Sequence, residues 1–167
     1  TDLKIGFHIW VLPLTGERKP QSYLKTQFEE RNGQISPNGR WMAYASFDSG
    51  HLEVYVRTFP DPNGGKWLVS VGGGSQPVWR RDGRELFFLS PEMKVLSVEV
   101  KTGRGGFEAS QPRVLFGRPR AGLSYTNLAA DYAVSADGQR FLANTALEEA
   151  GNSTITVLTN WTASLRK

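Results

Sequence analysis

The two histidines are the residues best suited to acid–base chemistry or to metal binding. His8 lies within a predicted strand, His51 lies at the tip of a predicted hairpin, and neither stands in a metal-ligand spacing such as HExxH. The 167 residues contain no cysteine, which excludes disulfides and thiolate metal sites. A zinc site would need carboxylates that the fold brings in from distant positions, so we predict no metal site.

Motifs for nucleophilic catalysis and for phosphate binding are absent or incomplete. No serine stands in a GxSxG nucleophile elbow. The run Gly72-Gly73-Gly74-Ser75 has the glycine content of a phosphate-binding loop, but no lysine follows it and no helix is predicted there. We interpret this run as a connection between two repeat units, and the sequence predicts neither a catalytic residue nor a cofactor site.

Two acidic turns contain oxygen groups of the kind that bind calcium. Asp48 is followed by Ser49, and Asp61 is followed at a distance of two by Asn63. Neither stretch completes the series of ligands found in a calcium-binding loop. Because aspartate and asparagine side chains readily hydrogen-bond to the backbone two residues further on, we interpret both stretches as ordinary turns.

Aromatic residues and arginines are the best candidates for binding a partner, since both types are enriched in interfaces. Trp79 and Arg80 lie where a predicted strand meets its hairpin turn. Tyr55, Arg57 and Trp67 are expected to contribute to another face. Packing between repeat units would explain the tryptophans without any partner, so both interpretations stay open.

Composition favours a turn-rich, all-β globular domain. Apolar residues make up 39% of the chain and charged residues 22%, with 18 glycines and 9 prolines. The net charge is +4 and the basic residues are scattered, which predicts a solvated surface and no nucleic-acid partner. No segment is long and apolar enough to span a bilayer, and no signal-peptide pattern opens the sequence, so we expect no membrane insertion by this chain.

One pattern recurs three times and organises the chain. Each copy has a short apolar run, a polar turn centred on Asn-Gly or Asp-Gly, and a second run rich in aromatic and aliphatic residues. Such dipeptides predict a tight primed hairpin turn with positive φ at its centre, and we interpret Asn38, Asp82 and Asp137 as residues that tolerate this left-handed conformation. The copies are GQISPNGRWMAYAS (Gly33–Ser46), QPVWRRDGRELFFLS (Gln76–Ser90) and DYAVSADGQRFLANT (Asp131–Thr145).

Period-two alternation and turn residues then predict the strands. Trp41, Phe87, Phe88 and Phe141 occupy the second strand of their units, and we assign them to the core. The predicted strands are Phe7–Leu14, Gln21–Thr26, Asn32–Ser36, Trp41–Ser46, Leu52–Phe59, Trp67–Val71, Gln76–Trp79, Glu85–Leu89, Val95–Val100, Arg113–Phe116, Tyr132–Ser135, Arg140–Asn144 and Thr154–Thr159.

The spacing of the repeats predicts a β-propeller. The hairpin glycines Gly39, Gly83 and Gly138 lie 44 and 55 residues apart, and a period of about 40 to 50 residues with four strands is typical of propeller blades. We predict a partial propeller of about three four-stranded antiparallel blades, truncated at both ends of the blade pattern. Its parts are a partial blade (1–28), two blades (29–72 and 73–118) and a partial blade (128–167). A β-sandwich is the competing architecture.

Four runs carry a family resemblance: SPNGRWMAYAS, EVYVRTFP, KWLVSVGGGSQPVWRRDGRELFFLS and ITVLTNW. They resemble the TolB-type, WD-like propeller repeats of bacterial proteins. They are also similar to the C-terminal propeller region behind serine/threonine kinase domains in some soil bacteria. The resemblance implies a non-catalytic protein- or peptide-binding module, sensory or scaffolding, in a larger bacterial protein. It favours an extracytoplasmic (periplasmic) domain, while the residues themselves leave the compartment unknown.

Two further expectations follow from the propeller interpretation. The chain lacks the Gly-rich loop, HRD-type loop and DFG motif of a kinase, so this chain alone is not expected to be an enzyme. The alternative is the propeller part of a hydrolase or peptidase, where it would shape access of the substrate. Incomplete blades leave apolar faces and unpaired strand edges, which predicts self-association through them.

Overall fold

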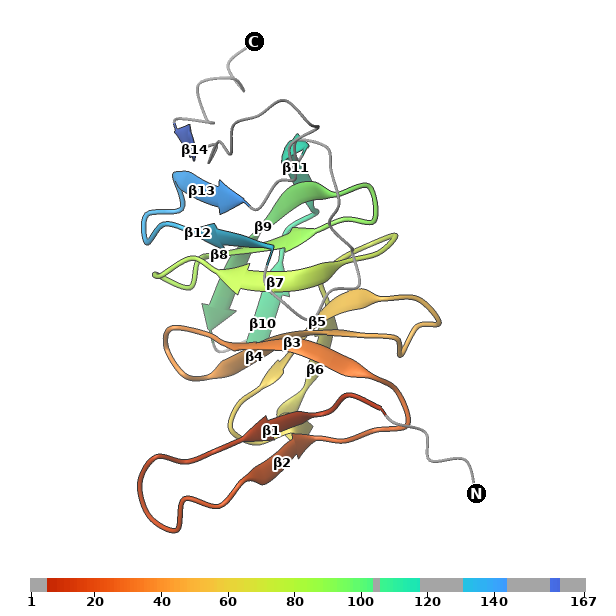
Figure 1. The fold of residues 1–167 in the computed structure, drawn as a ribbon, viewed down its shortest axis with the longest axis vertical. Coiled ribbons are helices and arrows are strands. Elements are labelled where there is room, and N and C mark those ends of the chain that lie inside the picture. The colour runs from red at the N-terminus through yellow and green to blue at the C-terminus, as the bar shows by residue number, and fades with distance from the viewer. Residues whose placement is uncertain (1–5, 104–105, 118–130, 144–156, 160–167) are drawn as a thin grey trace, which may run out of the picture.

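The computed structural model describes residues 6–103, 106–117, 131–143 and 157–159. These residues form fourteen strands and one short 3-10 helix, η1 (Pro62–Gly64). The strands make four antiparallel sheets that follow one another along the long axis of the molecule (Figure 1). This stack of sheets, each packed on the next, is the partial β-propeller that the repeats predicted.

The first two sheets come from the N-terminal part of the chain. The second one is a complete four-stranded blade with the strand order β3-β4-β5-β6. The strands of the first sheet are β1 (Ile9–Val11) and β2 (Gln21–Leu24), and those of the second are β3 (Glu30–Ile35), β4 (Trp41–Ser46), β5 (Glu53–Thr58) and β6 (Lys66–Leu68).

The third sheet has five strands, and the fourth has three within the described residues. The predicted strand Tyr132–Ser135 ends one residue early, at Val134, and residues 144 and 154–156 of the last two predicted strands lie outside the described part. The strands of the third sheet are β7 (Ser75–Trp79), β8 (Glu85–Leu89), β9 (Lys94–Gly103), β10 (Gly106–Ala109) and β11 (Arg113–Gly117), and those of the fourth are β12 (Tyr132–Val134), β13 (Arg140–Ala143) and β14 (Val157–Thr159).

Several predicted strands are shorter than expected, and in two of them the backbone groups at one end bond elsewhere. Ahead of β1, the carbonyl of Phe7 accepts from the Glu30 N–H at 2.8 Å, so the chain there belongs beside β3 and not beside β2. After β6, the N–H groups of Val69 and Ser70 both donate to the carbonyl of Val54, at 2.9 and 3.4 Å. Two consecutive residues thus face a single residue of β5, and this irregularity ends the regular pairing of β5 with β6.

Strand β10 was missed by the sequence analysis. It pairs with the C-terminal half of the long strand β9, whereas β11 pairs with the N-terminal half, so two strands share the fourth position of the blade. The break between them is held by Ser110, whose N–H donates to the Glu99 carbonyl at 2.9 Å and whose Oγ accepts from the Glu99 N–H at 2.9 Å. Beyond this break, the β9–β10 hairpin extends over the second sheet.

The recurring hairpin turn differs from the predicted primed turn. In the first copy, the Ser36 N–H bonds to the Trp41 carbonyl at 2.8 Å and the Gly39 N–H bonds to the Ser36 carbonyl at 2.9 Å. The loop therefore has four residues and begins with a β-turn that ends on a left-handed glycine. The same pair of bonds recurs in the other two hairpins, and φ is +67° at Gly39, +71° at Gly83 and +73° at Gly138.

Asn38, Asp82 and Asp137 therefore have a different role from the one predicted. Positive φ falls on the glycine after each of them, and none of the three has positive φ itself. Instead, one side-chain oxygen of each accepts from the backbone N–H two residues further on, at 3.1, 3.0 and 3.0 Å. These residues close the turn by hydrogen bonding, which explains why only asparagine and aspartate occur there.

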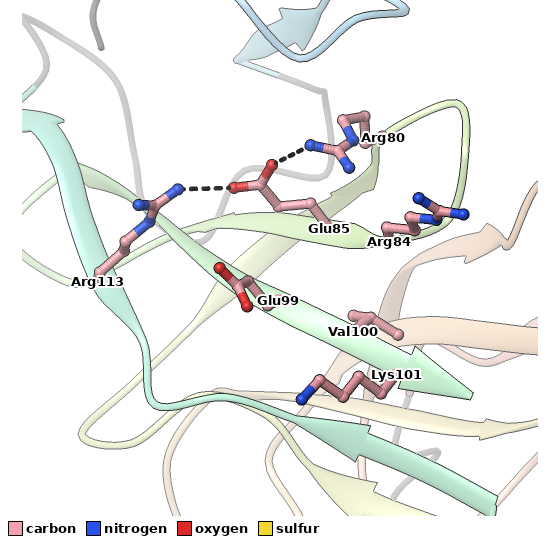
Figure 2. Close-up of a pocket in the computed structure, with 7 residues that line it drawn as sticks. All are labelled: Arg80, Arg84, Glu85, Glu99, Val100, Lys101 and Arg113. Atoms are coloured by element: carbon pink, nitrogen blue, oxygen red, sulfur yellow. Dashed lines mark hydrogen bonds and ion pairs between the residues drawn. The ribbon is translucent and has the colours of Figure 1, made fainter. Parts of the chain in front are cut away.

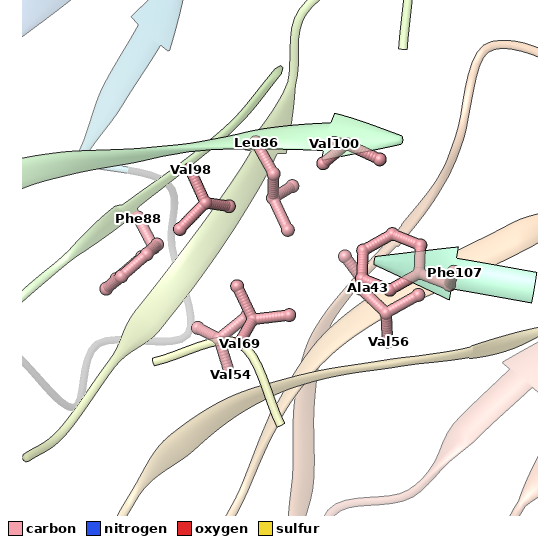
Figure 3. Packing of buried hydrophobic residues seen from close by; sticks show 9 residues of the cluster. All are labelled: Ala43, Val54, Val56, Val69, Leu86, Phe88, Val98, Val100 and Phe107. Carbon is pink, nitrogen blue, oxygen red and sulfur yellow. The ribbon is translucent and has the colours of Figure 1, made fainter. Parts of the chain in front are cut away.

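The apolar core is divided among the interfaces between sheets. Three of the predicted core residues are fully buried, namely Phe87, Phe88 and Phe141. Trp41 is half-buried and packs against the cluster that contains Phe88. Figure 3 shows the interface between the second and third sheets, where side chains from both sheets and from β10 meet. It is formed by Ala43, Val54, Val56, Val69, Leu86, Phe88, Val98, Val100 and Phe107.

Comparable clusters lie on either side of this interface. Between the first and second sheets, Tyr23 and Leu24 pack against Met42, Tyr44 and Tyr55. Between the third and fourth sheets, the cluster comprises Phe87, Leu89, Val95, Leu115, Tyr132 and Phe141. Among the described residues, no helix has the length and hydrophobicity needed to cross a bilayer.

Phe107 should be the residue that fixes the β9–β10 hairpin to the neighbouring blade. It is 3% exposed, and its ring lies 5.4 Å from that of Trp41 and 5.8 Å from that of Trp67. We expect Phe107→Ala to lower the free energy of unfolding by about 3 kcal/mol or more, because it leaves a cavity between two sheets. Urea denaturation measures this value. Val114→Ala, at a 49% exposed position of β11, is the control and should change it by about 0.5 kcal/mol at most.

Candidate functional site

A charged pocket of about 330 Å³ lies on the third sheet (Figure 2). Four basic and two acidic side chains line it, so its lining carries a net positive charge. In Figure 2 the two carboxylates lie between the cations, with Arg113 and Arg80 on either side of Glu85. The lining residues are Arg80, Arg84, Glu85, Glu99, Val100, Lys101 and Arg113.

The pocket exists because the two sides of β9 have different compositions. The side that faces the second sheet is apolar from Leu96 to Val100. The opposite side begins with Val95, which is buried against the fourth sheet, and continues with Ser97, Glu99 and Lys101. The apolar part of this face is covered and its charged part is open. The residues of the continuous apolar side are Leu96, Val98 and Val100.

Glu85 is the central charge of the pocket. Its side chain is only 7% exposed, and it lies directly opposite Glu99 in the β8–β9 register. One carboxylate oxygen accepts from Arg80 Nη1 at 2.9 Å, and the other accepts from Arg113 Nη2 at 3.4 Å. Both oxygens are therefore engaged by guanidinium groups, which compensates the cost of burying this charge.

Arg80 links this carboxylate to the hairpin turn. Its Nε and Nη2 both donate to Asp82 at 2.8 Å, a two-pronged contact that suits the planar guanidinium. These hydrogen bonds, with the bond from the Arg84 N–H, hold the pKa of Asp82 at about 2. The pKa of Arg80 is raised in return, mainly by the hydrogen bond to Asp82. Arg80 thus stays charged and fixed in position.

Arg84 and Lys101 are the two cations of the pocket that remain available. Both are exposed, and neither forms an ion pair with any residue in the described ranges. Arg84 extends from the turn, and Lys101 extends from β9 beyond Glu99 (Figure 2). An anionic group that enters the pocket would meet these two side chains first.

The fourth sheet contributes a backbone contact at the upper rim. Gly138 lies in the β12–β13 turn, and a Cβ built there would come within 2.7 Å of Arg80 Cδ and 3.4 Å of Phe87 Cζ. Its φ of +73° also disfavours any residue with a side chain. Gly138 therefore allows the neighbouring blade to approach Arg80 closely, and this holds the Arg80 stem in place.

A second hollow of about 140 Å³ adjoins the first. Glu99 and Lys101 line both hollows, so the two share a wall on β9. The remaining lining comes from the end of β10 and from the break that follows it. These residues are Glu108, Ala109 and Ser110.

Among the five residues predicted to bind a partner, Arg80 lines the pocket, whereas Trp79 packs at the interface between the second and third sheets. Trp79 is half-buried, its Nε1–H donates to the Gln34 carbonyl at 3.1 Å, and its ring meets that of Phe107 edge-on at 6.3 Å. Trp79 thus joins the second and third sheets, which is the packing role that the sequence left open.

Tyr55, Arg57 and Trp67 lie on the second sheet, away from the pocket lining. Tyr55 is 5% exposed and stacks on Tyr44 with ring centroids 5.8 Å apart. Arg57 donates to the Tyr44 hydroxyl at 2.9 Å and to the Pro62 carbonyl at 3.0 Å. Trp67 packs edge-on against Trp41 at 5.4 Å. As residues that bind a partner, all five remain a prediction.

Arg84, Glu85, Glu99, Lys101 and Arg113 were not singled out from the sequence. One signal could have indicated two of them, Glu99 and Lys101: in Val95–Lys101, one set of alternate positions stays apolar while the other changes from Val to Ser, Glu and Lys. A strand whose second face becomes charged midway cannot be covered fully by a neighbouring blade. The contribution of Arg113 could not have been read this way, because it depends on how β11 is placed beside β9.

Both histidines pair with buried glutamates of the second sheet. His8 Nδ1 lies 2.8 Å from a carboxylate oxygen of Glu30, and His51 Nε2 lies 2.8 Å from one of Glu53. Glu53 also accepts from Ser70 Oγ and from the Gly73 N–H, the latter at 2.9 Å. In the described part of the chain, no group of three or more His, Asp or Glu side chains could hold a metal ion.

The glycine run and Asp61 take the structural roles that were predicted, whereas the Asp48 side chain forms an ion pair instead. Gly72–Gly74 connects β6 of the second sheet to β7 of the third. Asp61 accepts from the Asn63 N–H at 3.0 Å, which is an ordinary turn contact, and Asp48 pairs with Lys66.

Comparison with known proteins bears on the fold alone. No protein-family model matches the sequence, and no curated protein matches it significantly. An oligogalacturonate lyase from Vibrio parahaemolyticus superimposes with a TM-score of 0.54 at 11% identity, over 82% of this chain and 36% of the lyase. TolB from Acinetobacter baumannii gives 0.46 at 14% identity, over 90% of this chain and 46% of TolB. The chain thus spans less than half of either structure.

The Asp82 carboxyl provides a pH-dependent readout of the pocket. Its pKa of about 2 in the folded protein lies below the ordinary value of 3.8, so the Arg80–Asp82 contact stabilises the fold above about pH 4 and loses this effect as the pH falls toward 2. We expect Arg80→Met to raise the pKa of Asp82 toward 3.8 in a carboxyl-detected NMR titration. The pKa of Asp137, which Ser135 lowers in the next hairpin, should not move and serves as the control.

Two glycines of the same turn separate backbone strain from the contact with Arg80. Gly39→Ala and Gly138→Ala should each cost about 1–2 kcal/mol, because alanine disfavours positive φ. A Cβ at Gly39 meets nothing within 4 Å, whereas one at Gly138 collides with Arg80. Only Gly138→Ala should therefore raise the pKa of Asp82. If NMR titration gives the same pKa for Asp82 in the two variants, Gly138 does not hold Arg80 in position.

Proposed function

We propose that this chain is a non-catalytic module that binds a protein or peptide. The observation that supports it is the open, net-positive pocket on the third sheet, in which Arg84 and Lys101 are exposed and form no ion pair within the described residues. Charged groups at an open rim steer a partner of opposite charge and select against others. The binding site that we propose is therefore the charged face of the third sheet.

The state of Glu85, the buried carboxylate of the pocket, favours binding over catalysis. General acid–base chemistry needs a carboxyl group that is free to exchange a proton with a substrate. Both oxygens of Glu85 are instead held by Arg80 and Arg113. Arg80 is itself anchored on Asp82, so the arrangement is a rigid scaffold of charges that orients the exposed cations.

The wider context of this proposal rests on the resemblance of the repeats. We propose that the module is the sensory or scaffolding part of a larger bacterial protein, with an extracytoplasmic location and with association to a kinase as in similar propellers. The chain spans 36% of the length of the lyase that shares its fold, which is consistent with further blades in a complete protein.

Selection from a random peptide display library tests the proposal. The immobilised chain should enrich a set of related peptides, and synthetic copies of them should bind with dissociation constants in the micromolar range. Replacing both exposed cations, in the double variant Arg84→Glu and Lys101→Glu, should weaken this binding at least tenfold by fluorescence anisotropy.

Arg40 provides a matched control, because it occupies in the β3–β4 turn the position that Arg84 occupies in the β7–β8 turn. The double variant Arg40→Glu and Lys25→Glu changes the net charge by the same amount at exposed positions outside the pocket. It should bind like the original protein. If no peptide is enriched, the proposed function is wrong, and if both double variants weaken binding equally, the proposed site on the third sheet is wrong.

A further inference from the structure

The two adjoining hollows have opposite charge, which points to the class of peptide that would fill them. The larger one is lined by four basic and two acidic side chains. The smaller one is lined by one basic side chain, Lys101, and by two acidic ones, Glu99 and Glu108. Along β9 the surface thus changes from net positive to net negative over a short distance.

Strand register places these charges on one face. Glu85 lies directly opposite Glu99 in the β8–β9 pair, and Lys101 lies directly opposite Glu108 in the β9–β10 pair. Residues opposite each other in an antiparallel pair project from the same side of the sheet. Glu99 and Lys101 are two residues apart on one strand, so they share that side and lie about 7 Å apart along it.

The exposed charges of the smaller hollow are not engaged within the described residues. Glu99 and Glu108 are exposed, and neither carboxylate forms a hydrogen bond or ion pair within the ranges that the structure describes. The break after β10 keeps the hollow open, because Ser110 turns toward the Glu99 backbone and Pro112 cannot donate to a strand ladder. A cationic side chain could be placed there between two carboxylates.

An extended peptide matches this layout. Its alternate side chains project from one side with the same spacing of about 7 Å as those of β9. We propose that the partner is an extended peptide segment with an acidic side chain and a basic side chain two or four residues apart. The acidic side chain contacts Arg84 and Lys101, and the basic side chain contacts Glu99 and Glu108. This inference rests on the proposed peptide-binding function.

Parallel selections with charge-reversed proteins test the pairing of charges. The probes are random 12-residue peptides displayed on phage, selected on the original chain, on Arg84→Glu and on Glu108→Lys. The original chain should enrich acidic and basic residues at a spacing of two or four. Arg84→Glu should lose the acidic preference, and Glu108→Lys should replace the basic preference with an acidic one.

Synthetic peptides from the first selection complete the test. Glu108→Lys should weaken their binding at least tenfold, and a Glu substituted for the basic residue of the peptide should restore it. Affinity for the original chain should fall as ionic strength rises, since the contacts are exposed. Glu108→Gln, which removes the charge without reversing it, should give an intermediate loss of binding affinity. It serves as the second variant if urea denaturation shows that Glu108→Lys is less stable than the original chain.

The outcomes separate this inference from the function on which it rests. Enriched peptides without the paired charges, or charge reversal without rescue, would overturn the inference and leave peptide binding intact. If no peptide is enriched on any of the three proteins, the proposed function fails together with it.

Discussion

Every sheet of this protein has two faces, and each face can leave water only against a neighbouring sheet. The second sheet illustrates this constraint: Tyr44 and Tyr55 pack toward the first sheet, while Val54 and Val56 pack toward the third. The strands therefore carry apolar residues on both faces, and the stability of the fold comes from the stacking of sheet on sheet. The β9–β10 hairpin strengthens the stack, because Phe107 inserts between aromatic rings of the adjacent blade.

The charged site lies where this constraint is relaxed. Along β9, the side that faces the second sheet stays buried to Val100, but the other side is covered only as far as Ser97 and then becomes charged and exposed. A blade that carries Glu99 and Lys101 cannot bury that region without losing their hydration. The open face is thus a consequence of composition within one strand, and the surrounding sheets hold its backbone rigid.

The repeat, the antiparallel blades and the core aromatics could be predicted because they depend on local pattern. The turn type was predicted wrongly, because Asn-Gly and Asp-Gly fit both a primed turn and a β-turn closed by a left-handed glycine. Strand β10 was missed since its short sequence is held in place by Ser110 and Phe107, which act through contacts with distant chain. The pocket was missed for the same reason, as Arg113 reaches Glu85 only through the pairing of β11 with β9.

Comparison of the three hairpins indicates why the site formed on the third sheet. The residue that opens the turn is Ser36 in the first hairpin and Ser135 in the last, and its hydroxyl both donates to the turn Asn or Asp and accepts from a strand N–H at 3.0 Å. The third sheet has Arg80 at this position, which keeps the contact with the turn carboxylate and adds a second one to buried Glu85. The scaffold of the turn is unchanged, while the neutral hydroxyl of serine is replaced by a guanidinium that begins a chain of charges across the blade. Because the serines close the same turn through a neutral hydroxyl, the turn itself does not require arginine at this position, and the Arg80–Glu85 contact is a feature of the third sheet that the repeat alone does not explain.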